Sequence, residues 1–374
     1  MEIIHIVLGK ANPNRMNGVN NVVYQLATEQ TSFGAEVSVW GITKDLTKNY
    51  EDRSFKTRLF KKDRNVFKPC KEILDALIEQ KGKAVFHIHG GWIPVFYTLT
   101  TFMVKHAIPY VYTPHGAYNE IAMKRNQIIK KAYFNLFERN IIKHALKIHC
   151  IGESEIEGLA TIHTVKKTVL LPYGFQFHNQ MPHLKAKRDD MIIGFMGRLD
   201  IYTKGLDLLL DGFKKFNQLI PNSRLWFIGD GEKRKLQDII STKGLNSSII
   251  LFGKKFGYEK ESLLKEMDVF VHPSRNEGLP SSVLEASNFG IPCIVTKATN
   301  ISQYVTNYNA GIGIENENSD AITIALGQIY ELWKKQSLYA MKLNAREMVK
   351  AEFNWKQLIP KFNELYQSIE SNES

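Results

Sequence analysis

The chain has 374 residues, of which 44% are hydrophobic and 23% are charged. This length favours two domains, and the composition is ordinary for a soluble globular protein. No apolar run approaches the roughly 20 residues of a membrane-spanning helix. The three cysteines are few and far apart, which favours a reducing compartment and argues against a disulfide framework.

The formal net charge of +11 suits an anionic partner such as nucleic acid, an anionic membrane surface or a nucleotide. No arginine-rich tail or nucleic-acid-binding motif is present, so we expect no nucleic acid partner. The N-terminal run MEIIHIVLGK has no basic leader before its apolar stretch and predicts a first strand instead of a signal peptide. We therefore expect a cytoplasmic protein.

Residues 1–174 predict one parallel α/β domain. A first strand is followed by a glycine-bearing loop, a helix from about residue 20 to residue 33, and the strand EVSVWGI, which together form a βαβ unit. Further short apolar runs are KAVFHIHGG, IPYVYTPHG, ALKIHCIGESE and KTVLLPYG. Ligands gather beyond the carboxyl ends of the strands in such sheets, so the polar residues that end these runs are candidates for a site.

Residues 175–190 are polar and basic without periodicity, and they predict a linker. A second strand–helix series follows over residues 191–354, with the strands MIIGFMG, SRLWFIGDG, SIILFGK, DVFVHPS and IPCIVT. Residues 355–374 predict a final helix. The expected fold class is α/β, with two doubly wound Rossmann-like domains facing each other across a cleft.

Two glutamates lie eight positions apart in HPSRNEGLPSSVLEASNFGIP: Glu277 in a turn, and Glu285 three residues after Ser282. The Ser282–Glu285 spacing fits a capping box, in which the glutamate only completes a helix N-terminus. Alternatively, the helix start attracts an anion and the carboxylate in the turn binds sugar hydroxyls. The residues themselves leave both interpretations open.

Two cations lie close together in GRLDIYTKG, where Arg198 follows a predicted strand and Lys204 precedes the next helix. Guanidinium and ammonium groups both bind phosphate oxygens, so this pair predicts a diphosphate clamp. The alternative is a solvated loop held by salt bridges.

Histidines end two predicted strands of the first domain. His115 in TPHGAYNE could orient a substrate or relay a proton, with a purely structural role as the alternative. His87 and His89 should share one strand face, but no third ligand is spaced to complete a metal site, so we predict no metal. Gly18 lies in the first loop, which lacks the GxGxxG dinucleotide fingerprint.

Taken in order, GRLDIYTKG, FIGDG, LFG, DVFVHPSRNEGLPSSVLEASNFGIPCIV and FNWKQLIPKFNELY resemble the motifs of glycosyltransferase family 4, which has the GT-B fold. Glu277 and Glu285 match its E-x7-E signature. The resemblance implies transfer of a sugar from a nucleotide diphosphate sugar, with a UDP- or GDP-sugar as the donor, to a hydroxyl of a glycan or lipid-linked acceptor. It further implies retention of anomeric configuration, no metal or cofactor, and a place in cell-surface polysaccharide synthesis.

The resemblance also implies which residues act. The implied catalytic residues are His115, Arg198, Lys204 and Glu277. The implied contacts to the nucleotide sugar are Gly18, Arg198, Lys204, Gly253, Lys254, Glu277, Gly278, Leu279 and Glu285. In this interpretation Glu277 binds sugar hydroxyls, Glu285 binds the ribose, and the two cations neutralise the departing diphosphate. The first domain would bind the acceptor, and the final helix would cross back onto it.

The sequence departs from the family at two positions. Asn17 precedes Gly18 where the family has paired glycines, and Tyr173 stands where it often has asparagine. Two other classes of function stay open beside the transferase. A nucleotide-sugar epimerase of the same architecture would need no acceptor, and a non-catalytic basic binding protein would give Glu277 no role.

Residues 122–147 form a basic segment in which lysines and arginines far outnumber the single acid Glu138, with aromatic residues between them. This pattern predicts a possible peripheral contact with an anionic membrane, on the inner face of the cell membrane. The alternative is a core-facing helix with a solvated basic side.

Overall fold

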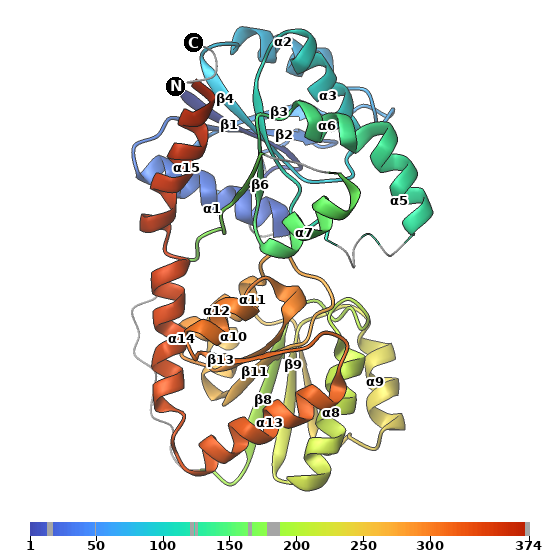
Figure 1. Ribbon diagram of the computed structural model, residues 1–374, viewed down its shortest axis with the longest axis vertical. Coiled ribbons are helices and arrows are strands. Elements are labelled where there is room, and N and C mark those ends of the chain that lie inside the picture. Colours follow the sequence, from blue (N-terminus) through green and yellow to red (C-terminus); the bar gives the residue numbers. More distant parts are fainter. Residues whose placement is uncertain are drawn as a thin grey trace. The chain divides into compact units, whose positions relative to one another are not determined.

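The computed structural model describes residues 1–12, 18–48, 50–119, 123, 126–163, 167–177 and 188–370. The chain divides into two compact units: unit 1 comprises Met1–Gly174 and Trp355–Ser374, and unit 2 comprises Phe175–Asn354. Each unit holds a parallel β-sheet with helices around it, as Figure 1 shows. Most of the predicted linker lies outside the described residues.

The sheet of unit 1 has the strand order β3–β2–β1–β4–β5–β6–β7, and all neighbours are parallel. Its strands are β1 (Glu2–Leu8), β2 (Val37–Thr43), β3 (Lys56–Lys61), β4 (Ala84–His89), β5 (Tyr110–Thr113), β6 (Lys147–Cys150) and β7 (Thr168–Leu170). The central strands are buried along almost their whole length, as expected where helices cover both faces. The strand order reverses between β1 and β4, which is where ligands bind in sheets of this kind.

Seven α-helices and one π-helical turn accompany this sheet in the described residues: α1 (Gly18–Ser32), α2 (Lys71–Glu79), α3 (Pro94–Lys105), α5 (Gln127–Tyr133), η1 (Phe134–Glu138), α6 (Arg139–His144), α7 (Glu153–Ile162) and α15 (Trp355–Glu370). α1 begins slightly earlier than we predicted and ends before Gly34, whose φ of +88° favours glycine. The final helix α15 packs beside α1 (Figure 1).

The two faces of this sheet bury different chemistry. One face packs apolar and aromatic side chains against α2, α3 and α6. The other face carries imidazoles, because His5 of β1 is paired in register with His87 of β4, and His89 lies two residues further on. All three rings are fully buried. Gln30 of α1 and Tyr366 of α15 hydrogen-bond to this face.

The sheet of unit 2 has the strand order β10–β9–β8–β11–β12–β13, again entirely parallel. Its strands are β8 (Met191–Met196), β9 (Ser223–Ile228), β10 (Ile249–Gly253), β11 (Val269–His272), β12 (Cys293–Thr296) and β13 (Gly311–Ile314). Its helices are α8 (Leu206–Leu219), α9 (Lys233–Thr242), α10 (Gly257–Glu266), α11 (Ser281–Asn288), the 3-10 turn η2 (Lys297–Thr299), α12 (Ser302–Asn307), α13 (Ser319–Lys334) and α14 (Tyr339–Glu352).

The basic segment does not form one continuous amphipathic helix. α5 buries none of its side chains, whereas η1 buries Phe134 and Glu138, and α6 buries Ile141 and Ile142. Its second half therefore packs into the core, as the alternative interpretation expected, and only its first half is exposed. No helix among the described residues is long and apolar enough to cross a membrane.

Candidate active site

The switch point of unit 2 brings two predicted site segments together. β8 and β11 are central neighbours, and the strand order reverses between them. The chain leaves β8 through Arg198 and leaves β11 toward Glu277, so both residues lie beyond the carboxyl ends of adjacent parallel strands. A doubly wound sheet places its ligands at this position.

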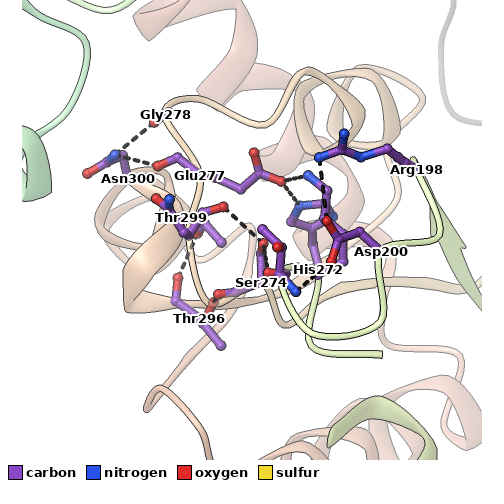
Figure 2. Close-up of polar contacts among 12 residues, drawn as sticks. Arg198, Asp200, His272, Ser274, Glu277, Gly278, Thr296, Thr299 and Asn300 are labelled. Atoms are coloured by element: carbon purple, nitrogen blue, oxygen red, sulfur yellow. Dashed lines mark hydrogen bonds and ion pairs between the residues drawn. The ribbon is translucent and has the colours of Figure 1, made fainter. Parts of the chain in front are cut away.

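Glu277 is the centre of a small charged cluster. Its Oε1 forms an ion pair with the ammonium of Lys204 and accepts a hydrogen bond from Nε2 of His272 at 3.0 Å. Figure 2 shows the Glu277 carboxylate above the His272 ring, with Arg198 and Asp200 nearby. The structure thus joins two residues that are 73 positions apart in the sequence, Lys204 and Glu277.

Lys204 owes its position to the glycine that follows it. Gly205 has a φ of +64°, and a Cβ there would lie 2.1 Å from the carbonyl oxygen of Pro273. Only glycine lets the start of α8 approach the loop after β11 this closely. The Lys204 side chain is 15% exposed. Burial, and secondarily the charge of Arg198, lower its pKa to about 8.

His272 is a site residue that our sequence analysis missed. It is the last residue of β11, and its ring lies stacked near Phe195 and Phe270. Burial lowers its pKa well below the usual value, so the imidazole is neutral and its Nε2–H donates to Glu277. Its Nδ1 is buried without a hydrogen-bond partner. The available signal was a polar residue at the end of the apolar run DVFVH.

The loop around Glu277 is held by hydrogen bonds from the next strand and its turn. The Thr296 hydroxyl donates to the carbonyl of Ser274 at 2.6 Å. Asn300, with a φ of +52°, donates from its side-chain amide to the carbonyls of Glu277 and Gly278 at 2.9 and 2.8 Å. Figure 2 shows these contacts on the side of the loop opposite Arg198. The amides of Gly278 and Leu279 make no hydrogen bond to a described residue.

Arg275 also fixes this loop. Its guanidinium binds both carboxylate oxygens of Asp207 at 2.8 Å and the carbonyl of Tyr202 at 2.7 Å. These contacts tie the loop after β11 to the segment that carries Lys204. Our sequence analysis assigned this arginine no role, because nothing in its local sequence identifies partners about 70 residues away.

Arg198 is less firmly held than Lys204. Its side chain is 64% exposed, and its nearest acidic partner is Asp200 at 3.6 Å. The arrangement combines both alternatives that the sequence left open, since one cation is solvated and salt-bridged while the other is buried beside Glu277. That the two bind diphosphate stays a prediction.

The capping-box interpretation of Glu285 was wrong. α11 begins at Ser281 after Pro280 in the cap position, and no side chain caps it. With the helix starting one residue before Ser282, that serine is itself helical and cannot serve as the cap. The Glu285 carboxylate instead pairs with Lys260 of α10 at 2.5 Å. It lies on the same helix that begins after Glu277, so the E-x7-E pair spans one loop and one turn of helix.

The remaining predicted donor contacts occupy separate places. Gly253 ends β10 with a φ of +71°, and Lys254 after it pairs with Asp230 at 3.3 Å. Gly18 is the first residue of α1, and a Cβ there would meet nothing within 4 Å. Packing therefore does not require glycine at this position, and its role toward a ligand stays a prediction. Gly18 and His115 belong to unit 1, whereas the other predicted residues belong to unit 2.

His115 lies just beyond β5 in a left-handed backbone conformation, with a φ of +56°. Its Nε2 is 3.1 Å from Nδ1 of His89, and its ring is stacked with that of Tyr173. The buried Glu155 carboxylate accepts a hydrogen bond from the amide of Gly116 and so holds this turn. Burial raises the pKa of Glu155 to about 7. Tyr173, the departure noted above, thus packs directly on the predicted catalytic histidine.

A third imidazole accompanies His87 and His89. His5 comes from the neighbouring strand, so spacing along one strand gave no sign of it, and the nitrogens of the three rings lie within 4.8 Å of one another. Our statement that no third ligand was available was therefore wrong, although each ring nitrogen already has a hydrogen-bond partner.

Comparison with known proteins identifies the family. Residues 176–348 match the family described as glycosyl transferases group 1, and residues 16–176 match glycosyltransferase family 4. The chain belongs to the family 4 glycosyltransferases. Its predicted fold class, two Rossmann-like α/β domains of the GT-B type, is confirmed. A sucrose-phosphate synthase from Thermosynechococcus elongatus has the same fold, with a TM-score of 0.76 over 99% of both chains at 17% identity.

Two relatives indicate the setting in which such enzymes work. The glycosyltransferase is 25% identical over 277 residues, 68% of each chain, to the UDP-Gal:α-D-GlcNAc-diphosphoundecaprenol α-1,3-galactosyltransferase of Escherichia coli. It is 24% identical over 339 residues, 84% of this chain and 86% of the other, to the capsular polysaccharide biosynthesis glycosyltransferase CapM of Staphylococcus aureus.

Proposed function

We propose that this glycosyltransferase moves a sugar from a UDP- or GDP-sugar to a hydroxyl of a glycan or lipid-linked acceptor, with retention of configuration. The observation that carries the proposal is the cluster of Lys204, Glu277 and His272 at the switch point of unit 2. It offers a cation for phosphate and an oriented carboxylate for hydroxyls within one side chain's reach.

The leaving group gains negative charge as the anomeric bond breaks. Lys204 and Arg198 supply fixed positive charge beyond β8, and the amides of Gly278 and Leu279 lie free at the start of α11. Preorganised donors of this kind stabilise a transition state by about 2.7–4 kcal/mol each. Because these charges are part of the chain, we expect transfer to proceed without a metal ion. Undiminished turnover in EDTA supports this expectation, and lost turnover restored by a divalent cation contradicts it.

Glu277 would hold the donor sugar. Its Oε1 is engaged by Lys204 and His272, which leaves Oε2 to accept hydrogen bonds from sugar hydroxyls. The diphosphate would then share Lys204 with the carboxylate. Glu285 would bind the ribose hydroxyls, and it must loosen its ion pair with Lys260 to do so.

Retention follows from what the cluster lacks. The described contacts of Glu277 are to cationic or neutral donors, and no second carboxylate joins it as a glycosidase-like acid and nucleophile pair would require. We infer that the acceptor hydroxyl attacks the face from which the phosphate departs, and that the phosphate takes the proton. NMR of the product tests this, since an inverted anomeric carbon would contradict it.

The donor can be identified by thermal unfolding. A ligand that binds only the folded protein raises the melting temperature, so UDP, GDP and their sugars can be ranked directly. Incubation of the best donor alone then tests the epimerase hypothesis, which no feature of the site favours. Transfer only when an acceptor is added supports the transferase, whereas an epimerised donor without acceptor contradicts it.

The acceptor class is suggested by the two relatives, one of which is named for a diphosphoundecaprenol acceptor and the other for capsular polysaccharide biosynthesis. We propose a lipid-linked glycan of a cell-surface polysaccharide as the acceptor. Assays with short glycans carrying either a lipid diphosphate or no lipid test this, and equal turnover of both would remove the lipid from the proposal.

The exposed half of the basic segment would bring the enzyme to such an acceptor. On α5 and η1, Ile128, Ile129 and Leu136 are 86, 71 and 66% exposed, and basic side chains lie between them in the sequence. We propose peripheral contact with an anionic bilayer through this surface. Sedimentation with anionic liposomes should fall when Ile128 and Ile129 are replaced by serine. The exposed Ile324 of unit 2, replaced in the same way, is the control, and equal binding by all three proteins would contradict the proposal.

A further inference from the structure

A continuous hydrogen-bond chain runs through the imidazole face of unit 1. Its members, in order, are His115, His89, His5, Gln30, Tyr366, His87, Thr113, His149 and the carbonyl of Leu171. The eight successive distances between nitrogen and oxygen atoms range from 2.6 to 3.2 Å. The members come from four strands, two helices and the turns beyond the strands, so the chain exists only when unit 1 is folded.

One end of the chain fixes the direction of its first half. The carbonyl of Leu171 can only accept, so Nε2 of His149 carries the proton. A neutral His149 then accepts at Nδ1 from the single hydroxyl proton of Thr113. The Thr113 oxygen must accept from Nε2 of His87, and Nδ1 of His87 must accept from the hydroxyl of Tyr366.

The same direction continues through the second half. The Tyr366 oxygen accepts from the amide nitrogen of Gln30, whose carbonyl oxygen accepts from Nε2 of His5. His5 accepts at Nδ1 from Nε2 of His89, and His89 accepts at Nδ1 from Nε2 of His115. Each link then has one donor and one acceptor, and no group has to change its state to satisfy another.

Burial keeps the five rings neutral, which the assignment requires. It lowers the pKa of His115 to about 3, that of His5 and His149 to about 4, and those of His87 and His89 well below their usual value. Neighbouring imidazoles in one low-dielectric layer would also repel each other's charge.

We propose that this chain holds His115 as the tautomer protonated at Nε2, so that its Nδ1 is a fixed hydrogen-bond acceptor. Nδ1 makes no hydrogen bond to a described residue, and His115 is the half-exposed member of the chain. The inference rests on the proposed place of His115 at the donor sugar. There an acceptor-only nitrogen would bind a sugar hydroxyl and would not deliver a proton. His89 and Tyr366 are accordingly positioning residues.

A metal ion on His5, His87 and His89 is the competing explanation of this cluster. All six of their ring nitrogens already take part in the chain, so a metal would displace hydrogen bonds that are otherwise complete. Metal analysis of the purified protein separates the two, since stoichiometric metal would overturn the chain.

The decisive measurement is long-range proton–nitrogen NMR of protein labelled with [15N]histidine, in which the two neutral tautomers give different patterns. His115 is assigned from the signal lost in His115→Gln, and we expect it to be protonated at Nε2 alone. Tyr366→Phe removes the hydroxyl that joins the two halves. It should give His115 a second tautomer and lower kcat/KM roughly two- to tenfold, as the loss of one hydrogen bond would.

Tyr110→Phe is the matched control. Tyr110 is also buried in this sheet, and its hydroxyl donates to the carbonyl of Ile141 at 2.7 Å outside the chain. This variant should leave the tautomer of His115 unchanged. A wild-type His115 protonated at Nδ1, or a tautomer unmoved by Tyr366→Phe, would overturn the inference. Normal turnover by His115→Gln with the expected tautomers would support the chain while removing His115 from the proposed function.

Discussion

Unit 1 and unit 2 treat their polar side chains in opposite ways. Unit 1 packs five imidazoles into a layer under its sheet, and hydrogen bonds between neutral groups satisfy them. Unit 2 gathers formal charges at the carboxyl ends of β8 and β11, where the Lys204 and Glu277 side chains are 15 and 16% exposed.

Solvent access accounts for the difference. A fully buried ionised group without a counter-charge is too costly to retain, so the imidazoles give up their protons. The loops of unit 2 lie close enough to water to keep ions, which pair with one another until a charged ligand arrives. We infer that unit 1 supplies fixed geometry and unit 2 supplies charge, and each prediction below tests one side of this contrast.

The largest effect should come from removing the buried cation. Lys204→Ala should lower kcat by about 10²- to 10³-fold, because a preorganised charge beside the leaving group is lost. Thermal unfolding should change little, since Glu277 keeps its hydrogen bond from His272. Lys215→Ala, which removes an exposed ion pair with Asp320, is the control. Near-normal turnover by Lys204→Ala would remove the charge of unit 2 from the mechanism.

The pH dependence of turnover sharpens the same point. Lys204 acts in its protonated form, and its pKa is lowered to about 8, so turnover should fall as the pH rises through that value. Lys204→Arg should move this decline to higher pH, because a guanidinium stays charged. A decline at the same pH in both proteins would assign it to another group.

Acid should destabilise unit 1 more than unit 2. The unfolded chain binds protons on histidine near pH 6.5, whereas the five buried rings do not, so stability falls as the pH drops from 6.5 toward 4. Each histidine contributes up to about 1.4 kcal/mol per pH unit. Glu138 and Glu155, whose pKa values burial raises to about 7, act in the opposite direction but are outnumbered.

Amide hydrogen exchange resolved by peptide measures this effect separately in the two units. After correction for intrinsic rates, β1 and β4 should lose protection at pH 5 relative to pH 7.5 by more than β8 and β9. Equal losses in both sheets would mean that the imidazole layer is not what limits acid stability.

The smallest effect should come from the histidine under Glu277. His272→Leu removes the donor to the carboxylate and should raise KM for the donor roughly tenfold, because an unheld Glu277 loses its orientation. Unfolding should be little affected, since the partnerless Nδ1 disappears as well. His272→Gln restores a side-chain donor and should recover most of the loss. An unchanged KM in His272→Leu would show that Lys204 alone positions Glu277.

The local pattern of the chain was enough to predict the strands, the helices between them and the candidate residues at strand ends. An apolar run that ends in Gly, His or Ser predicts where the chain leaves a parallel sheet, and Arg198, Lys204, Glu277 and His115 were all found by this rule. It failed where a role depends on a distant partner, as for His272, Arg275 and Asn300. It also misplaced the start of α11, because Ser282–Glu285 has the spacing of a capping box without its backbone geometry.

The sequence by itself therefore determined a two-domain α/β glycosyltransferase with its motif residues in order. Only the tertiary structure decided which of those residues meet, such as Lys204 with Glu277 across 73 positions and His87 with Tyr366 across 279. The reason is physical. Periodicity and turn residues act over a few neighbours, whereas the partner and protonation state of a buried side chain depend on whichever strands and helices fold against it.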